Sequence, residues 1–154
     1  VGVVFLGIHF RKSPDSINIL DAELNNFLIS SSRYTSDCVL KEPFYADLTE
    51  LVKGCYSNSV CSDSRQACNV MNQTYNNILR APNPLKAGEG RPISSNQISF
   101  YYQENLEDPN TKNEFYNIFL GDNVNGSCSL KKTGRYVRYS YPGNIVIEFE
   151  ICKS

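Results

Sequence analysis

The sequence has no tryptophan, a single histidine and no apolar run long enough to cross a bilayer. The lone histidine, His9, excludes mechanisms that need a histidine pair, and it excludes a histidine-rich metal site. Residues 1–10 are apolar but too short for a transmembrane helix. No basic segment precedes them and no small-residue cleavage site follows them, so we interpret them as the first strand of a mature chain.

The chain also lacks a strong charge of either sign. Its 15 basic and 16 acidic residues give a net charge of -1, without long runs of like charge. This balance argues against nucleic acid or an anionic membrane as a partner. The sequence contains no P-loop, no G-x-G-x-x-G and no G-x-S-x-G motif. We therefore expect no cofactor and no nucleic-acid partner.

Cysteine, in contrast, is plentiful, at Cys38, Cys55, Cys61, Cys68, Cys128 and Cys152. The close spacings, C-x5-C and C-x6-C, match neither zinc-ligand pairs nor a C-x-x-C redox motif. The even number favours three disulfides over reduced buried thiols or a metal site. Because only Cys128 and Cys152 lie in the C-terminal part, we expect at least one bridge between the two parts. If those two pair with each other, Cys38 must bridge within the N-terminal part.

Two glycosylation sequons also indicate an oxidising compartment. Asn125-Gly126-Ser127 lies in a turn-rich stretch, whereas Asn72-Gln73-Thr74 falls on a predicted helix. Together with the cysteines, they predict a secreted glycoprotein or one on the extracellular face of the cell surface, such as an ectodomain module or a secreted effector. With 41% hydrophobic and 20% charged residues, the chain fits a single domain over residues 1–154.

The apolar periodicity predicts helices in the first part of the chain and strands in the second. A strand is predicted at 3–10, and helical spacing predicts a first helix over 13–31 with Ser13 as its N-cap. A second helix is predicted with Asp47 and Glu50 as a capping box, and a third helix is predicted to begin at Ser62 or Ser64. Beyond the proline-rich loop at 81–92, alternation predicts strands at 97–103, 114–120, 127–132, 135–141 and 144–152. The predicted fold is α+β: an N-terminal strand, three helices, then a four- to five-stranded antiparallel sheet, disulfide-stabilised.

The last hairpin permits a prediction of register. If Val137 lies opposite Ile147, the alternating apolar residues of both strands share one face, and the loop has an odd number of residues. On that register Tyr136, Arg138, Glu148 and Glu150 would share the other, polar face.

Tyrosines in the predicted sheet suggest a binding surface, since tyrosine and arginine are enriched at protein interfaces. The candidate residues are Tyr101, Tyr102, Tyr116, Tyr136 and Arg138. We expect an extracellular module that binds a protein or glycan without catalysis. The alternative is a small secreted hydrolase of glycosidase type that uses Glu148 and Glu150 as its carboxylates. An enzyme needs a pocket enclosing both carboxylates, whereas a binding module needs an exposed patch with aromatic side chains.

Overall fold

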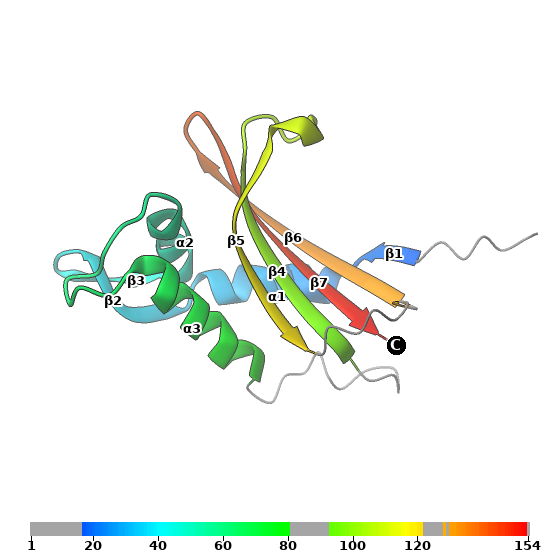
Figure 1. Cartoon of the computed structure of the whole chain (residues 1–154), viewed down its shortest axis with the longest axis horizontal. Helices are drawn as coiled ribbons and strands as arrows, with labels where there is room; N and C mark the ends of the chain where they lie inside the picture. Colours follow the sequence, from blue (N-terminus) through cyan, green and yellow to red (C-terminus); the bar gives the residue numbers. More distant parts are fainter. Residues whose placement is uncertain (1–16, 81–92, 122–127, 129, 154) are drawn as a thin grey trace, which may run out of the picture.

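The computed structural model describes residues 17–80, 93–121, 128 and 130–153, and it has the predicted α+β organisation (Figure 1). The strand predicted at residues 3–10 and the loop at 81–92 lie outside the described residues. The helices are α1 (Ala22–Ser32), α2 (Leu48–Tyr56) and α3 (Ala67–Arg80). Short strands accompany them: β1 (Ile17–Leu20), β2 (Thr35–Lys41) and β3 (Phe44–Asp47). The long strands are β4 (Ile93–Gln103), β5 (Lys112–Gly121), β6 (Leu130–Ser140) and β7 (Gly143–Lys153).

The main sheet has the strand order β1-β6-β7-β4-β5 (Figure 1). β4 and β5, and likewise β6 and β7, are antiparallel neighbours, as their short connections predict. β4 also pairs antiparallel with β7, so β5 and β6, which the next short link joins, lie at opposite sides of these four strands and are not neighbours. β1 joins the edge of the sheet in parallel with β6, with Ile17 opposite Leu130. β2 and β3 form a separate two-stranded hairpin, which the periodicity does not predict.

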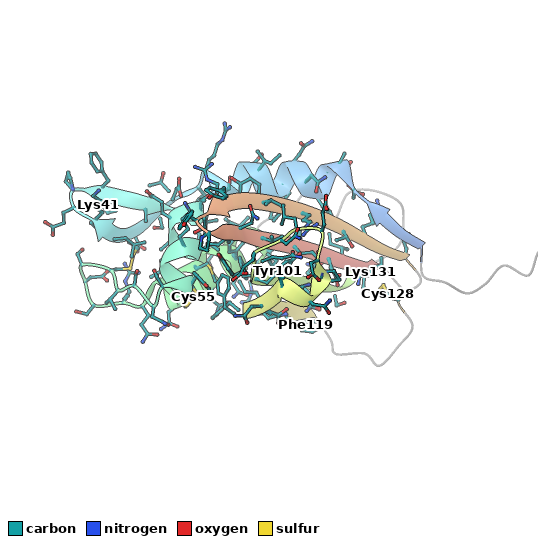
Figure 2. All side chains as sticks on the ribbon, turned by 90° about the horizontal axis from the view of Figure 1, so that it is seen from above. Lys41, Cys55, Tyr101, Phe119, Cys128 and Lys131 are labelled. Atoms are coloured by element: carbon teal, nitrogen blue, oxygen red, sulfur yellow. A yellow bond between two sulfur atoms is a disulfide. The ribbon has the colours of Figure 1, made fainter. Side chains whose placement is uncertain are left out.

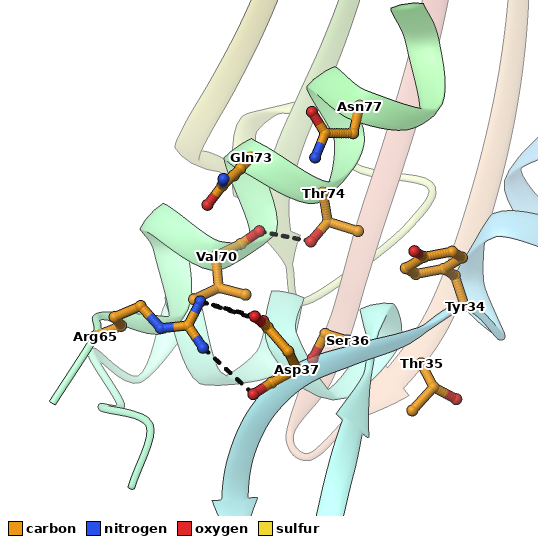
Figure 3. A pocket seen from close by; sticks show the side chains of 9 residues that line it. All are labelled: Tyr34, Thr35, Ser36, Asp37, Arg65, Val70, Gln73, Thr74 and Asn77. Atoms are coloured by element: carbon orange, nitrogen blue, oxygen red, sulfur yellow. Dashed lines mark hydrogen bonds and ion pairs between the residues drawn. The ribbon is translucent and has the colours of Figure 1, made fainter. Parts of the chain in front are cut away.

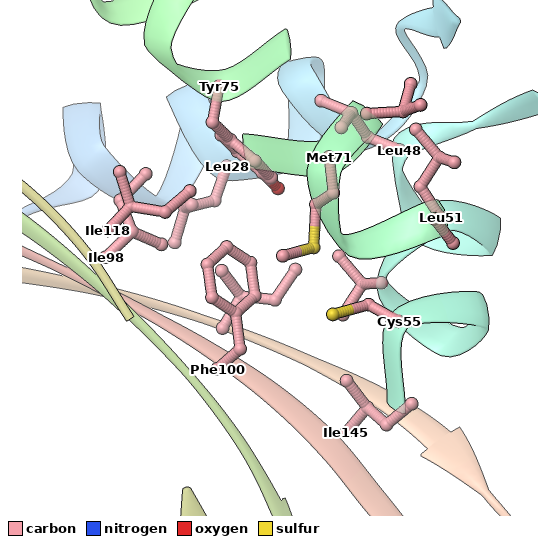
Figure 4. Close-up of a cluster of buried hydrophobic side chains, with 14 of the residues drawn as sticks. Leu28, Leu48, Leu51, Cys55, Met71, Tyr75, Ile98, Phe100, Ile118 and Ile145 are labelled. Carbon is pink, nitrogen blue, oxygen red and sulfur yellow. The ribbon is translucent and has the colours of Figure 1, made fainter. Parts of the chain in front are cut away.

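The three helices cover one face of the main sheet, and we call the face that none of them covers the open face (Figure 1). Alternate strand residues such as Phe100 and Phe149 are fully buried on the helix-covered face. Phe100 contacts the Tyr75 ring of α3, with ring centroids 5.4 Å apart, and Phe149 contacts the Phe27 ring of α1 at 5.3 Å. Figure 4 shows this layer, in which Met71 and Tyr75 of α3 project toward Phe100 of the sheet.

The start of the first helix differs from the prediction. α1 begins after Asp21, whose side chain accepts hydrogen bonds from the backbone N–H groups of Glu23 (2.8 Å) and Leu24 (3.3 Å). Ser13 is therefore not the N-cap, because Ile17–Leu20 forms β1 instead of a helical turn. Pairing with the edge of β6 satisfies the backbone of this segment, and this tertiary contact outweighs its local helical pattern.

The second helix confirms the predicted capping box. The Asp47 carboxylate accepts from the Glu50 N–H at 2.8 Å, and the Glu50 carboxylate accepts from the Asp47 N–H at 2.9 Å. The third helix begins later than predicted, at Ala67. The residues before it form a turn in which the Cys61 N–H donates to the Arg65 carbonyl at 2.7 Å.

All six cysteines form disulfides, as predicted. The pairs are Cys38–Cys61, Cys55–Cys68 and Cys128–Cys152. The expectation of a bridge between the helical part and the sheet is wrong, since Cys128 and Cys152 pair with each other. Cys38 then bridges within the helical part, as that pairing requires. In the part of the chain that the structure describes, no helix is long and apolar enough to cross a membrane.

The register of the last hairpin is also different. Val137 lies opposite Val146 and Tyr136 opposite Ile147, with only Tyr141 and Pro142 in the turn. The even-numbered residues of β6 therefore face the helices, including Gly134, over which α1 passes. A Cβ atom at Gly134 would lie 2.5 Å from the Leu24 Cβ, so this register places the one residue without a side chain beneath the helix. β6 is also continuous through Thr133 and Gly134, where a link between two strands is predicted.

Candidate functional site

The corrected register changes which residues lie near the two candidate carboxylates. Glu148 and Glu150 lie on the open face, whereas Tyr136 and Arg138 belong to the opposite, helix-covered face of β6. The cross-strand neighbour of Glu148 on β6 is instead Arg135. The predicted group of Tyr136, Arg138 and the two glutamates is therefore wrong, because a shift of one residue exchanges the faces of a strand.

Glu148 belongs to a polar cluster with Tyr101 and Lys112. The Tyr101 hydroxyl donates to Glu148 Oε2 at 3.2 Å, and Lys112 Nζ lies 3.8 Å from Glu148 Oε1. The same ammonium lies 4.0 Å from the centroid of the Tyr101 ring. Burial, followed by the nearby Glu148 carboxylate, raises the pKa of Tyr101 to about 12. Tyr101 therefore stays protonated and donates to Glu148 at neutral pH.

Each carboxylate of the hydrolase hypothesis has its own lysine. Glu150 pairs with Lys131 at 2.7 Å, as Glu148 pairs with Lys112. The Glu150 side chain is 27% exposed and the Glu148 side chain is 23% exposed. These contacts hold two separate ion pairs on the open face, and the hydrolase hypothesis stays a prediction. Among the described residues, no group of three or more acidic, cysteine or histidine side chains is placed to hold a metal ion.

The candidate binding tyrosines expose little surface. Tyr101 is 2% exposed and Tyr102 is 9% exposed. The Tyr102 ring stacks on Tyr56 at 5.1 Å, while Tyr116 and Tyr136 pack against the core. Arg138, by contrast, is exposed near the end of β6. The binding role of these five residues stays a prediction, and four of them have most of their surface inside the fold.

The most exposed aromatic side chains of the described residues lie at the turns of two hairpins. At the β6–β7 turn, Tyr139 is 64% exposed and Tyr141 is 85% exposed, and both lie close in sequence to Arg138. We call Arg138, Tyr139 and Tyr141 the tyrosine tip. The sequence contains a signal for it, since Tyr141 precedes a proline in a short link between strands.

A second exposed pair belongs to the β2–β3 hairpin. Phe44 is 73% exposed and Tyr45 is 61% exposed, just after the turn at Glu42 and Pro43. We call Phe44 and Tyr45 the phenylalanine tip. Figure 2 shows this hairpin, with Lys41 labelled, projecting from the end of the molecule opposite Cys128. The sequence pattern does not reveal this pair, because it assigns residues 43–55 to the second helix, whereas Phe44–Asp47 forms β3.

A cavity of about 410 Å³ lies between β2 and α3 (Figure 3). Residues 34–37 form one wall, and the side of α3 that carries Gln73, Thr74 and Asn77 forms the other. Arg65 closes one end and Tyr34 the other. Arg65 donates from Nε to Asp63 at 2.7 Å, and its Nη1 lies 3.2 Å from Asp37. The hydrogen bond from Arg65 holds the pKa of Asp63 below its usual range.

The two sequons fall in different parts of the chain. Asn72 lies on α3, where its side-chain oxygen accepts from Asn76 Nδ2 at 2.8 Å, and Asn125 lies outside the described residues. Comparison of the chain with protein-family models, with curated proteins and with solved structures found no significant match.

Proposed function

We propose that this protein is a secreted or cell-surface module that binds another extracellular protein through its exposed hairpin turns. The observation that carries the proposal is the tyrosine tip, in which two tyrosines are 64% and 85% exposed and Arg138 is exposed on the other side of the same strand end. Single exposed apolar residues are normal on protein surfaces, but tyrosine and arginine together are the residue types that dominate binding energy at interfaces.

The position of the tyrosine tip supports this role. β6 and β7 are paired along their whole length, from Leu130 opposite Lys153 to Ser140 opposite Gly143. The turn is therefore fixed to a sheet that continues into the core. A rigid turn loses little conformational entropy on binding, and a tyrosine side chain has few rotatable bonds. Three disulfides among the described residues support an oxidising, extracellular location.

The test begins with the intact, oxidised protein on a panel of extracellular domains, followed by affinity measurement on each partner found. We expect Tyr139→Ala with Tyr141→Ala to weaken binding at least about tenfold, which corresponds to ~1.4 kcal/mol. Val60→Ala is the matched control, because Val60 is a large apolar residue, 53% exposed, outside both tips. The phenylalanine tip is tested in parallel with Phe44→Ala and Tyr45→Ala.

Two results would contradict the proposal. One is a panel in which no extracellular protein binds the oxidised chain. The other is a partner whose affinity is unchanged by the double variants at both tips, since that partner would use another surface.

A further inference from the structure

The cavity between β2 and α3 has an unusual balance of charge. Its ionic lining residues, Asp37 and Arg65, are paired with each other at one end, and Asp63, which lies beside the cavity, also pairs with Arg65. Arg65 Nη2 also donates to the Asp37 backbone carbonyl at 3.3 Å, so both ends of the guanidinium already have acceptors. An anion would therefore find no free cation here, and it would meet one more carboxylate than basic groups.

The rest of the cavity is lined mainly by polar side chains that are exposed to solvent. Among the described residues, the side chains of Gln73, Asn77 and Thr35 make no hydrogen bond, and the Tyr34 hydroxyl makes none either. Gln73 and Asn77 lie one helical turn apart, so their amides lie on the same side of α3. Each amide offers both donors and an acceptor. Thr74 Oγ1 donates to the Val70 carbonyl at 2.8 Å and keeps its lone pairs available.

Tyr34 adds an apolar surface beside these polar groups. Its backbone is fixed at both ends, since its N–H donates to the Ser31 carbonyl at 2.9 Å and its carbonyl accepts from the Leu48 N–H at 3.0 Å. Its side chain is 53% exposed, and Figure 3 shows the ring at the end of the cavity opposite Arg65. The ring therefore has a defined place without being part of the core.

We propose that this cavity binds a neutral sugar residue, with the Tyr34 ring against a C–H face of the pyranose and the Gln73 and Asn77 amides on its hydroxyl groups. A sugar hydroxyl both donates and accepts, which matches the two amides, and an uncharged ring matches a site whose ionic groups are already paired. The volume of about 410 Å³ lies within the range of small-ligand sites, roughly 300–1,000 Å³. This site is separate from both hairpin tips, so it does not depend on the protein-binding proposal.

The experiment titrates enzymatically deglycosylated protein with methyl glycosides of mannose and galactose, with N-acetylglucosamine and with glucosamine. Binding is followed by calorimetry and by the NMR signals of the glutamine and asparagine side-chain amides. We expect at least one sugar to bind with a dissociation constant of millimolar order and to shift the Gln73 and Asn77 signals. Oligosaccharides that end in the same sugar are titrated in parallel, and tighter binding of these would identify a glycan chain rather than a free sugar as the ligand.

The variant Gln73→Ala with Asn77→Ala should weaken binding at least about tenfold, or ~1.4 kcal/mol. Asn69→Ala is the matched control, because Asn69 is an exposed amide on α3 outside the cavity. Alanine suits a helix, so both variants should fold, and circular dichroism verifies this. Thr74 is not substituted, because it also completes the Asn72 sequon.

Three outcomes would overturn the proposal. The first is that none of the sugars binds at concentrations of tens of millimolar. The second is binding that the double variant leaves unchanged. The third is a preference of tenfold or more for glucosamine over N-acetylglucosamine. Glucosamine carries a positive charge and N-acetylglucosamine does not, so this preference would mean that the site recognises a cation and not a neutral sugar.

Discussion

Replacement of Gly134 by alanine tests the packing of α1 on the sheet, because two physical effects of opposite sign meet at this residue. A Cβ atom at Gly134 would lie 2.5 Å from the Leu24 Cβ, 2.8 Å from the Leu24 carbonyl carbon and 3.0 Å from the Asn25 backbone nitrogen. Two of these three neighbours are backbone atoms of α1. A change of rotamer cannot relieve the contact, so either the helix or the strand has to move.

The sign of the effect follows from comparing the two contributions. Alanine is favoured over glycine within a strand by roughly 0.5–1 kcal/mol, because glycine loses more backbone freedom on folding. Overpacking in a well-packed interior costs about 1–3 kcal/mol. The difference between the two ranges is about 0–2.5 kcal/mol, and because two of the three close neighbours are backbone atoms, we expect the upper part of it, a destabilisation of about 1–2 kcal/mol. At ~2–4 °C per kcal/mol for a chain of this size, the melting temperature should fall by about 2–8 °C.

Urea unfolding followed by far-UV circular dichroism gives the free energy of unfolding for the wild type and Gly134→Ala. Tyrosine fluorescence provides a second probe, since the chain has ten tyrosines and no tryptophan. The slope against urea should not change, because the surface exposed on unfolding is nearly the same. A variant as stable as the wild type, or more stable, would refute the close approach of α1 to β6 and with it the observed register.

Three further predictions concern other contacts. Asp47→Ala should lower the free energy of unfolding by ~1 kcal/mol in the same assay. Asp47→Asn should nearly preserve it, because asparagine caps a helix as well as aspartate does. Equal losses in the two variants would argue against the capping box. Glu148→Gln should lower the pKa of Tyr101 from about 12, because it removes a nearby negative charge. A pH titration followed by the NMR signal of the tyrosine Cζ measures this pKa, and an unchanged pKa would exclude the Tyr101–Glu148 contact. Proteolysis without reduction should yield linked peptides for Cys38–Cys61, Cys55–Cys68 and Cys128–Cys152, and any other pairing would contradict this fold.

Features decided by neighbouring residues could be predicted from the sequence. The capping box of α2 involves Asp47 and Glu50 only, and the apolar side of α3 follows from residues spaced one turn apart, such as Met71 and Tyr75. The class of fold follows from the same local periods, because helical spacing gives way to alternation after residue 96.

Features decided by distant contacts were predicted incorrectly or not at all. The segment Ile17–Leu20 has a helical pattern, but it pairs with β6 more than a hundred residues later. The register of β6 and β7 depends on α1 passing over Gly134, which alternation within the two strands does not reveal. The cavity lies between residues 34–37 and α3, which are far apart in the sequence, so no single sequence motif contains all the residues proposed to contact the sugar. The tyrosine tip is an intermediate case, since the tyrosines are evident in the sequence but their faces depend on the register.

One of the disulfides anchors the hairpin that lies outside the main sheet. An isolated two-stranded hairpin is only marginally stable, and β2–β3 lies outside the main sheet. Cys38–Cys61 ties it to the turn before α3, and a hydrogen bond of 2.7 Å from Ser36 Oγ to the Ala46 carbonyl joins its strands. Closing a loop with a sequence separation of 23 is worth ~3 kcal/mol in the chain-entropy description. The bridge therefore orders a hairpin that carries the phenylalanine tip and one wall of the cavity, so partner and sugar would both meet surfaces already held in place.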